Sequence, residues 1–189
     1  MPIGLAGWAD MAHSVELIFD TAGEAAIQRI WRILAAAGLP SQVQVKSDTN
    51  RPHVTLVAAR HICADVDAAL RSLAPALPMA CVVGAPVVFP GPRQTLARLI
   101  VPSAGLLALH ERVFGLCLPY IAGEPFGHCR PGHWTAHATL GRRFTAAQIG
   151  AALALDDDGL HTEFPAQLVG LRRWDSDNRV DHLLVSRAD

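Results

Sequence analysis

The chain has 189 residues, a length that suits one ordinary domain or two small lobes that share a core. Hydrophobic residues make up 51% of the sequence and charged residues only 17%, which excludes a disordered chain and favours a dense core. Sixteen basic and seventeen acidic residues leave a formal net charge of -1, so no overall positive field attracts long nucleic acids. Any contact with nucleic acid must therefore be local.

The four cysteines form no C-x-x-C pair and no short metal-ligand spacing, which argues against a zinc ribbon and a disulfide-dense secreted scaffold. They are Cys63, Cys81, Cys117 and Cys129. The first basic residue is Arg29, so the N-terminus lacks the charged start of a secretory signal, and no apolar run reaches membrane-spanning length. We therefore expect free thiols in a cytoplasmic protein that does not contact a membrane.

The first half of the chain alternates between strand and helix patterns. Its predicted elements are residues 14–20 (strand), 21–37 (helix), 52–59 (strand), 64–73 (helix), 79–89 (strand) and 95–101 (strand). Gly38 and Pro40 end the first helix, and a turn rich in proline joins the last two strands.

The second half repeats this order. Its predicted elements are residues 103–118 (helix), 134–140 (strand), 145–155 (helix), 167–174 (strand) and 180–186 (strand). The repetition predicts an internal duplication within a single domain at 1–189, with two lobes at roughly 21–102 and 103–189. Residues 119–133 form the longest irregular segment, which fits a functional loop and a plain surface connection equally well.

One short motif occurs in equivalent strands of the two halves. The first copy is His53-Val54-Thr55-Leu56, and the second, 84 residues later, is His137-Ala138-Thr139-Leu140. Because side chains alternate between the faces of a strand, each histidine shares a face with the threonine two positions on. Each strand therefore presents one imidazole and one hydroxyl to a common surface.

Two such strands facing each other supply the groups that phosphodiester cleavage needs. One imidazole can accept a proton from the attacking oxygen while the other donates a proton to the leaving oxygen, and histidine suits both roles near neutral pH. Threonine hydroxyls can donate hydrogen bonds to the non-bridging phosphate oxygens. This chemistry needs no metal and no cofactor.

The paired H-x-T-x motifs, set in a duplicated α/β pattern, resemble the 2H phosphoesterase superfamily, which includes 2'-5' RNA ligase-like proteins and cyclic nucleotide phosphodiesterases. The resemblance implies an α+β class with a duplicated bilobal fold, in which two antiparallel sheets line a central cleft and helices lie outside. It also implies metal-independent chemistry on 2',3'-cyclic or 2'-5' phosphate linkages. His53 and His137 would then be the acid/base pair, and Thr55 and Thr139 would bind the phosphate.

Two questions arise at the second motif: which histidine begins it, and which arginine faces the phosphate. His133-Trp134-Thr135 is a further H-x-T triplet, but His137 is preferred because Leu140 matches the first motif and Gly132 suggests that the strand has barely begun at His133. Strict alternation points Arg143 toward the phosphate. Family members often carry an arginine at the place of Arg142, which a bulge at Gly141 would turn inward, and Arg142 is therefore preferred.

Four residues outside the motifs carry weaker expectations. Arg60 is a candidate phosphate contact, although an exposed arginine at a strand end explains it better. Trp31 and Trp134 are expected to pack in the core, whereas Phe126 in the irregular segment is the better candidate for stacking on a base.

We expect a monomer that acts on a nucleotide or a short RNA. Lys46 is the only lysine and lies in K-S-D-T, which lacks the glycine of the lysyl-nucleotide ligase pattern, so any RNA ligation would reverse the opening of a cyclic phosphate. The alternatives are a metal-dependent hydrolase that uses the same histidines and a non-catalytic nucleotide-binding module. The sequence leaves open which histidine is the acid.

Overall fold

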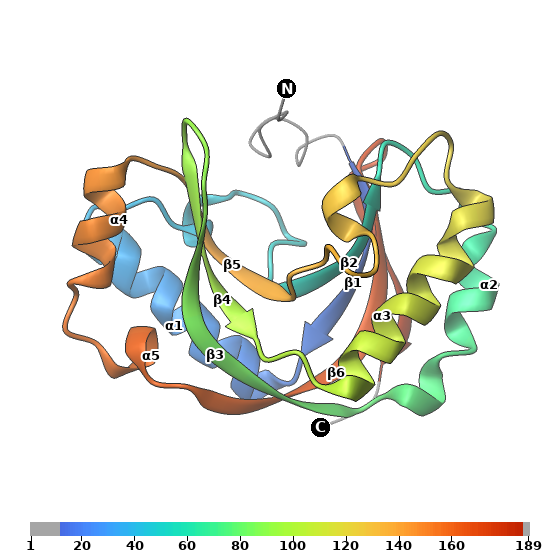
Figure 1. The fold of residues 1–189 in the computed structure, drawn as a ribbon, viewed down its shortest axis with the longest axis horizontal. Helices are drawn as coiled ribbons and strands as arrows, with labels where there is room; N and C mark the ends of the chain where they lie inside the picture. The colour runs from blue at the N-terminus through green and yellow to red at the C-terminus, as the bar shows by residue number, and fades with distance from the viewer. Residues whose placement is uncertain (1–11, 187–189) are drawn as a thin grey trace.

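A single antiparallel sheet of seven strands forms the frame of the protein. The computed structural model describes residues 12–186 (Figure 1). The strands are β1 (His13–Phe19), β2 (His53–Ala59), β3 (Met79–Phe89), β4 (Gln94–Ile100), β5 (His137–Phe144), β6 (Phe164–Asp175) and β7 (Val180–Ser186). They follow the order β2-β1-β6-β3-β4-β5, and β7 also pairs with β6. The expected α+β class is confirmed.

The strands of the two lobes form one continuous sheet, whereas two sheets were expected. The first half of β3 pairs with the first half of β6, from Met79 opposite Leu168 to Val83 opposite Phe164. Beyond this segment β3 continues alongside β4, and β6 continues between β1 and β7. Two long strands thus belong to both lobes, and the sheet bends around their shared segment (Figure 1).

In the described part of the chain, five helices lie outside this sheet. They are α1 (Thr21–Ala36), α2 (Val66–Arg71), α3 (Ala104–Cys117), α4 (Ala146–Leu153) and α5 (Asp158–His161). Four 3-10 turns accompany them, at Gln42–Gln44, Ala74–Ala76, Leu118–Tyr120 and Gly127–Cys129. Among the described residues, no helix is long and apolar enough to span a membrane.

Helix α1 shows how the local sequence builds these elements. Its buried residues Ile27, Ile30, Trp31 and Leu34 recur at helical spacing and join the core. The carboxylate of Asp20 caps the helix by accepting a hydrogen bond from the backbone N–H of Gly23. The apolar face therefore fixes how α1 packs on the sheet.

Each lobe takes helices from both halves of the chain. Helix α1, from the first half, contacts β5, whereas α3, from the second half, contacts β2. In Figure 1, α1 and α4 lie at the left of the view and α2 and α3 at the right. The repeat boundary near residue 102 stays a prediction, because packing does not follow the halves of the chain.

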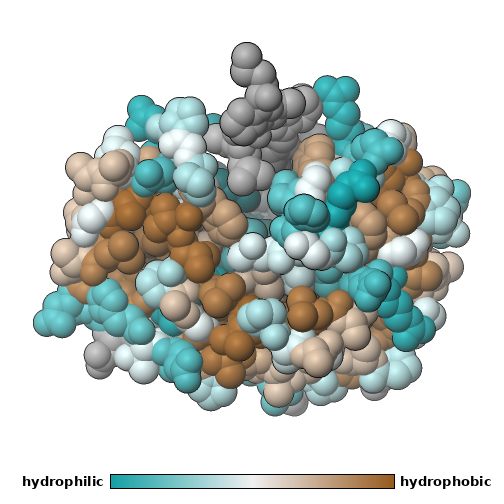
Figure 2. Space-filling view, in the orientation of Figure 1, coloured by the Kyte–Doolittle hydropathy of each residue, from teal (hydrophilic) through white to brown (hydrophobic). Residues whose placement is uncertain are grey.

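The polarity of the surface follows this arrangement. Figure 2 shows apolar side chains over the left and lower parts of the face seen in Figure 1, and hydrophilic ones along its upper rim. The turn between β3 and β4 and the upper end of β2 lie along this rim (Figure 1).

Strand β5 begins and ends later than the sequence predicted, at His137 and Phe144 instead of residues 134 and 140. Its pairing with β4 is irregular on both sides of the Leu96–Gly141 pair. A Cβ atom on Gly141 would lie 2.8 Å from Cε2 of Phe144 and still closer to the carbonyl oxygen of Pro40. Glycine is therefore required where the loop after α1 approaches this strand.

We expect Gly141→Ala to lower the free energy of unfolding by about 1–3 kcal/mol, because the backbone of Pro40 must move to admit the methyl group. Urea denaturation measures the change. Gly150→Ala is the matched control, since nothing lies within 4 Å of a Cβ at that helical position and alanine favours the helix. Equal effects of the two substitutions would contradict the close approach.

Candidate active site

Strands β2 and β5 contact each other and carry the two H-x-T motifs. In both motifs the histidine and threonine are partly exposed while the intervening residues are buried. The partly exposed residues are His53, Thr55, His137 and Thr139, and the buried residues are Val54, Leu56, Ala138 and Leu140. The predicted alternation is confirmed for both strands.

The backbone holds both imidazoles in the same way. Nδ1 of His53 lies 2.8 Å from the carbonyl oxygen of Arg51, and Nδ1 of His137 lies 2.7 Å from that of Thr135. A carbonyl oxygen can only accept a hydrogen bond, so Nδ1 carries the proton in each neutral ring. Nε2 is then the nitrogen that accepts or releases a proton during a reaction.

The indoles of two tryptophans bind the backbone carbonyl groups of the two motif threonines. The indole of Trp31 donates a hydrogen bond to the carbonyl oxygen of Thr139 at 3.0 Å, and that of Trp134 donates to the carbonyl oxygen of Thr55 at 2.9 Å. Trp31 is buried as expected, whereas Trp134 is half-buried and stacks on the ring of His110 at 4.0 Å. Trp134 precedes β5 and reaches β2, so it joins the two motif strands directly.

His137 lies among apolar and cationic groups. Its ring centroid is 4.5 Å from that of Phe89. Burial lowers the pKa of His137 to about 4, and the positive charges of His53, Arg142 and His128 lower this pKa further, against the hydrogen bond to Thr135. His137 is therefore neutral at pH 7 in the ligand-free protein.

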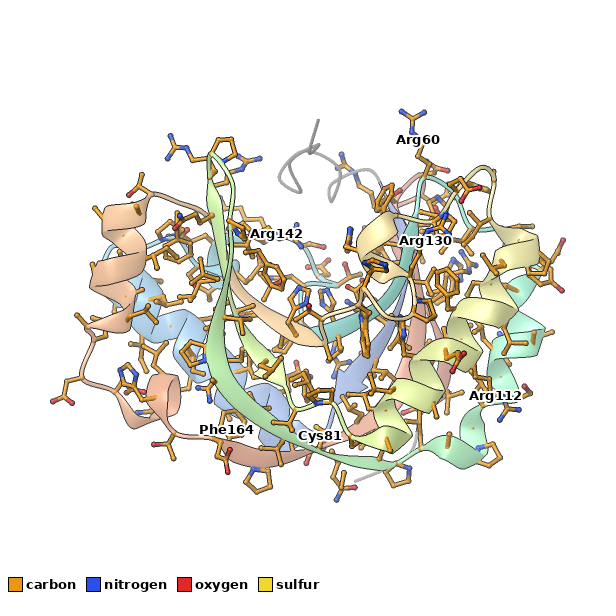
Figure 3. The ribbon with its side chains drawn as sticks, viewed as in Figure 1. Arg60, Cys81, Arg112, Arg130, Arg142 and Phe164 are labelled. Carbon is orange, nitrogen blue, oxygen red and sulfur yellow. The ribbon has the colours of Figure 1, made fainter. Side chains whose placement is uncertain are left out.

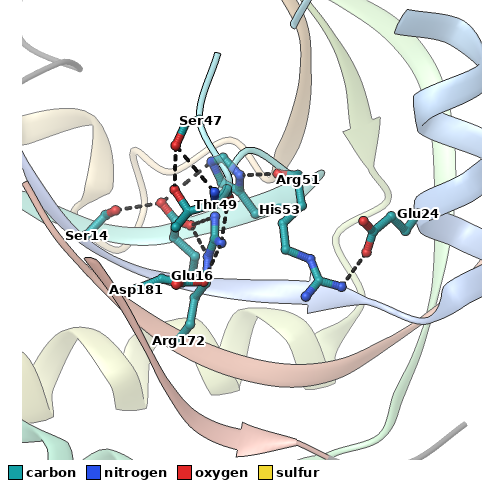
Figure 4. A network of polar contacts seen from close by, with 9 residues as sticks. All are labelled: Ser14, Glu16, Glu24, Ser47, Thr49, Arg51, His53, Arg172 and Asp181. Carbon is teal, nitrogen blue, oxygen red and sulfur yellow. Dashed lines mark hydrogen bonds and ion pairs between the residues drawn. The ribbon is translucent and has the colours of Figure 1, made fainter. Parts of the chain in front are cut away.

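His53 differs because a buried carboxylate lies beside it (Figure 4). Oε1 of Glu16 is 3.6 Å from Nε2 of His53, and Oε2 of Glu16 accepts a hydrogen bond from Nε of Arg172 at 2.8 Å. Glu16 is opposite Thr55 in the sheet, and Arg172 is opposite Glu16, so these side chains share the face of the first motif. The residue opposite Thr139 is Ala97, which offers no charge.

These contacts set the charge of the network. Burial raises the pKa of Glu16, but His53, Arg172 and a hydrogen bond from Ser14 together hold this pKa below its usual value, so Glu16 is a carboxylate. Burial lowers the pKa of His53, and Glu16 opposes that shift while Arg172 and Arg142 add to it. Glu16 is thus the anionic side chain that opposes the loss of a proton from His53.

The arginines after the second motif differ in position. The positive charge of Arg142 lowers the pKa of both motif histidines, which places Arg142 near both rings. Figure 3 shows Arg142 toward the middle of the molecule and Arg60 projecting from the upper rim. Arg143 adopts a left-handed φ of 67°, at the irregular end of β5. The role of Arg142 as a phosphate ligand stays a prediction.

The preceding turn contains the alternative histidine. His133 is exposed in a turn that ends before β5, and its backbone N–H donates a hydrogen bond to the carbonyl oxygen of Arg130. The strand has therefore not begun at His133, in agreement with the preference for His137. Phe126 is half-buried, and its backbone N–H donates a hydrogen bond to the carbonyl oxygen of Ala58, so the irregular segment packs against the C-terminal end of β2.

Sequence reasoning missed Glu16, Phe89 and His128. The sequence did contain a signal for Glu16, because a carboxylate in the otherwise apolar strand Val15–Phe19 needs a partner once it is buried.

The expected free thiols are confirmed, since all four cysteines are unpaired. Burial raises the pKa of Cys81 and Cys117 to about 12, which makes both thiols unreactive.

Solved structures match the chain over nearly its whole length. Usb1 of Kluyveromyces marxianus is 13% identical with a TM-score of 0.53, covering 93% of this chain and 98% of Usb1. LigT of E. coli in complex with 3'-AMP is 11% identical with a TM-score of 0.55, covering 94% and 95%. A phosphoesterase is 15% identical with a TM-score of 0.53 and the same coverage. No family model and no curated protein matches the sequence.

These similarities define the fold as the bilobal α+β fold that Usb1 and LigT share. The fold that the two motifs led us to expect is thus confirmed.

We expect the imidazole of His137 to titrate with a pKa of about 4 in the ligand-free protein, and its Nδ1 to carry the proton above that pH. Imidazole nitrogen chemical shifts measured by NMR over a pH series test both statements. The urea-unfolded chain is the control and should titrate near 6.5. A pKa near 6.5 in the folded protein would contradict the burial of this ring.

Proposed function

We propose that the protein is a metal-independent phosphodiesterase that opens 2',3'-cyclic phosphates or 2'-5' linkages in RNA ends or small nucleotides. One observation carries the proposal: two imidazoles occupy equivalent places on touching strands, each bound through Nδ1 and each with a threonine two residues on. RNA ligation, as the reverse of cyclic-phosphate opening, belongs to the same proposal.

The reaction uses each group once. A neutral imidazole accepts a proton from water as the water oxygen attacks phosphorus, and the bond from phosphorus to the 2' or 3' oxygen breaks. The second imidazole, protonated at Nε2, donates that proton to the leaving oxygen. Thr55 and Thr139 donate hydrogen bonds to the non-bridging oxygens, and Arg142 balances their charge. The histidine pair ends with its proton exchanged between the rings.

The unequal surroundings of the rings favour one assignment of roles. Glu16 lies within ion-pair distance of Nε2 of His53 and stabilises a proton on that ring. His137 has Phe89 and cationic groups around it, which favour its neutral form. We therefore assign His53 as the acid and His137 as the base, with Glu16 as a positioning residue.

The comparisons support a nucleotide as the ligand. Usb1 of Kluyveromyces marxianus has been solved with uridine monophosphate and LigT of E. coli with 3'-AMP. The formal net charge of -1 favours a small nucleotide or a short RNA over a long duplex. A cytoplasmic monomer remains part of the proposal.

We expect hydrolysis of a 2',3'-cyclic nucleotide to continue in EDTA, and His53→Ala and His137→Ala each to reduce turnover by about 10²–10⁴-fold. Thr55→Ala and Thr139→Ala should each reduce turnover by a smaller factor, since the phosphate keeps its other ligands. Chromatography of the nucleotide products measures the rates.

His133→Ala is the matched control and should retain the wild-type rate, since His133 lies in a turn outside β5. A loss as large as that of His137→Ala would mean that the motif starts at His133. Loss of activity in EDTA that added metal restores would favour the metal-dependent hydrolase, and nucleotide binding without turnover would favour the binding module.

We expect a bell-shaped pH dependence of kcat/KM, because activity requires one charged and one neutral imidazole. Glu16→Gln removes the negative charge beside His53 and so lowers the pKa of that ring. If His53 is the acid, activity is lost at lower pH than before, and the alkaline limb moves down by about one unit or more.

Asp181→Asn is the control for this experiment. Asp181 contacts Arg172 at 3.1 Å but is no partner of His53, so both limbs should stay in place. A shift of the acidic limb in Glu16→Gln would instead assign His53 as the base.

A further inference from the structure

A second group of chemically active side chains lies at the far end of β1 and β2 from the H-x-T motifs. His13 is the first residue of β1, His61 follows the end of β2, and Asp175 and Asp177 lie where β6 turns toward β7. His13 pairs with Ala59 in the sheet, whereas His53 pairs with Ile18. At about 3.3 Å per residue, β2 separates this group from His53 by roughly 20 Å.

The ligand atoms of three members, His13, His61 and Asp177, converge on one point, and Asp175 approaches His13. Nε2 of His13 lies 3.0 Å from Oδ2 of Asp177 and 3.6 Å from Oδ1 of Asp175, and Nδ1 of His61 lies 3.4 Å from the same oxygen of Asp177. The ligand atoms of His13, His61 and Asp177 all lie within 4.8 Å of one another. A tetrahedral zinc ion with bonds of about 2.0–2.1 Å would hold its ligands about 3.3 Å apart. The spacing of these three atoms therefore approaches that of a tetrahedral zinc site, and Asp175 is the fourth residue beside them.

The buried histidine has more acceptors than it can satisfy. The side chain of His13 is 1% exposed, and two carboxylate oxygens approach its Nε2. A single N–H can point at only one of them. A cation between the carboxylates and Nε2 would satisfy every group that faces it.

The remaining ligands are already oriented or accessible. Oδ1 of Asp175 accepts hydrogen bonds from the backbone N–H groups of Asp177 and Asn178, and its Oδ2 accepts one from the side chain of Asn178. His61 is 51% exposed and Asp177 66% exposed, so an ion can reach them from solvent.

We propose that His13, His61, Asp175 and Asp177 bind a divalent transition-metal ion, for which zinc is the best match. Two imidazole nitrogens and two carboxylate oxygens suit zinc, cobalt and nickel, whereas magnesium and calcium prefer oxygen ligands alone. The ligands come from the start of β1, the segment after β2 and the turn after β6. The ion therefore ties three segments together and stabilises the fold, and it is too far from the H-x-T motifs to act in their chemistry.

Titration of the tag-free, metal-stripped full chain with Co²⁺ tests the site. We expect the visible absorption of tetrahedral Co²⁺ to saturate at one ion per chain. Zn²⁺ at about 100 times its dissociation constant should raise the melting temperature by about 5–10 °C.

His61→Ala and Asp177→Asn replace exposed ligands and should each abolish the absorption and the rise in melting temperature. His161→Ala is the matched control, because it removes an exposed histidine from another part of the chain and should leave both signals intact. No absorption in the wild-type chain, or full absorption in His61→Ala, would overturn the proposal.

The proposed metal site and the proposed phosphodiesterase activity can be refuted independently of each other. Removing the ion should lower the melting temperature while turnover of a cyclic nucleotide continues at temperatures where the chain stays folded. Absence of turnover in a chain that binds Co²⁺ would count only against the proposed function, and turnover in a chain that does not bind Co²⁺ would count only against the metal site.

Discussion

The antiparallel pairing of β3 with β6 is the contact on which the rest of the structure depends. Five residue pairs, from Met79–Leu168 to Val83–Phe164, join the strands of both lobes into one sheet. Each long strand then continues into a different lobe, so β2 and β5 meet from opposite ends of the sheet. Because the pleat alternates with a period of two, both motifs can present a histidine and a threonine to the same space.

The two H-x-T motifs make the same backbone hydrogen bonds but differ in the charge of the residues beside them. Both imidazoles bind a carbonyl oxygen two residues before them, and both threonine carbonyls accept an indole hydrogen bond. The residues opposite the threonines differ, since Glu16 faces the first motif and Ala97 the second. A buried carboxylate held by Arg172 gives one ring a partner for its positive charge, and a two-histidine mechanism needs such inequality.

Strand β6 contributes residues to both the Glu16–His53 network and the proposed metal site. Arg172 points to the motif face and binds Glu16, whereas Arg173 points to the other face and binds Asp67 of α2 at 2.6 Å. The same strand ends at Asp175, which approaches His13. Both arginines are buried, so loss of either carboxylate partner would leave a buried positive charge unpaired. Any shift of this strand would disturb the Glu16 network and the proposed metal ligands together.

The order of the strands and of the four longer helices, the two motifs and the face that each motif presents could be predicted from local periodicity and turn residues. The sequence also favoured His137 over His133. Only the tertiary structure decided that α1 and α3 pack on opposite halves, that the sheet is continuous, and that Glu16 lies beside His53. Such contacts join residues far apart in the chain, and their partners depend on strand register and burial, which no local pattern of residues specifies.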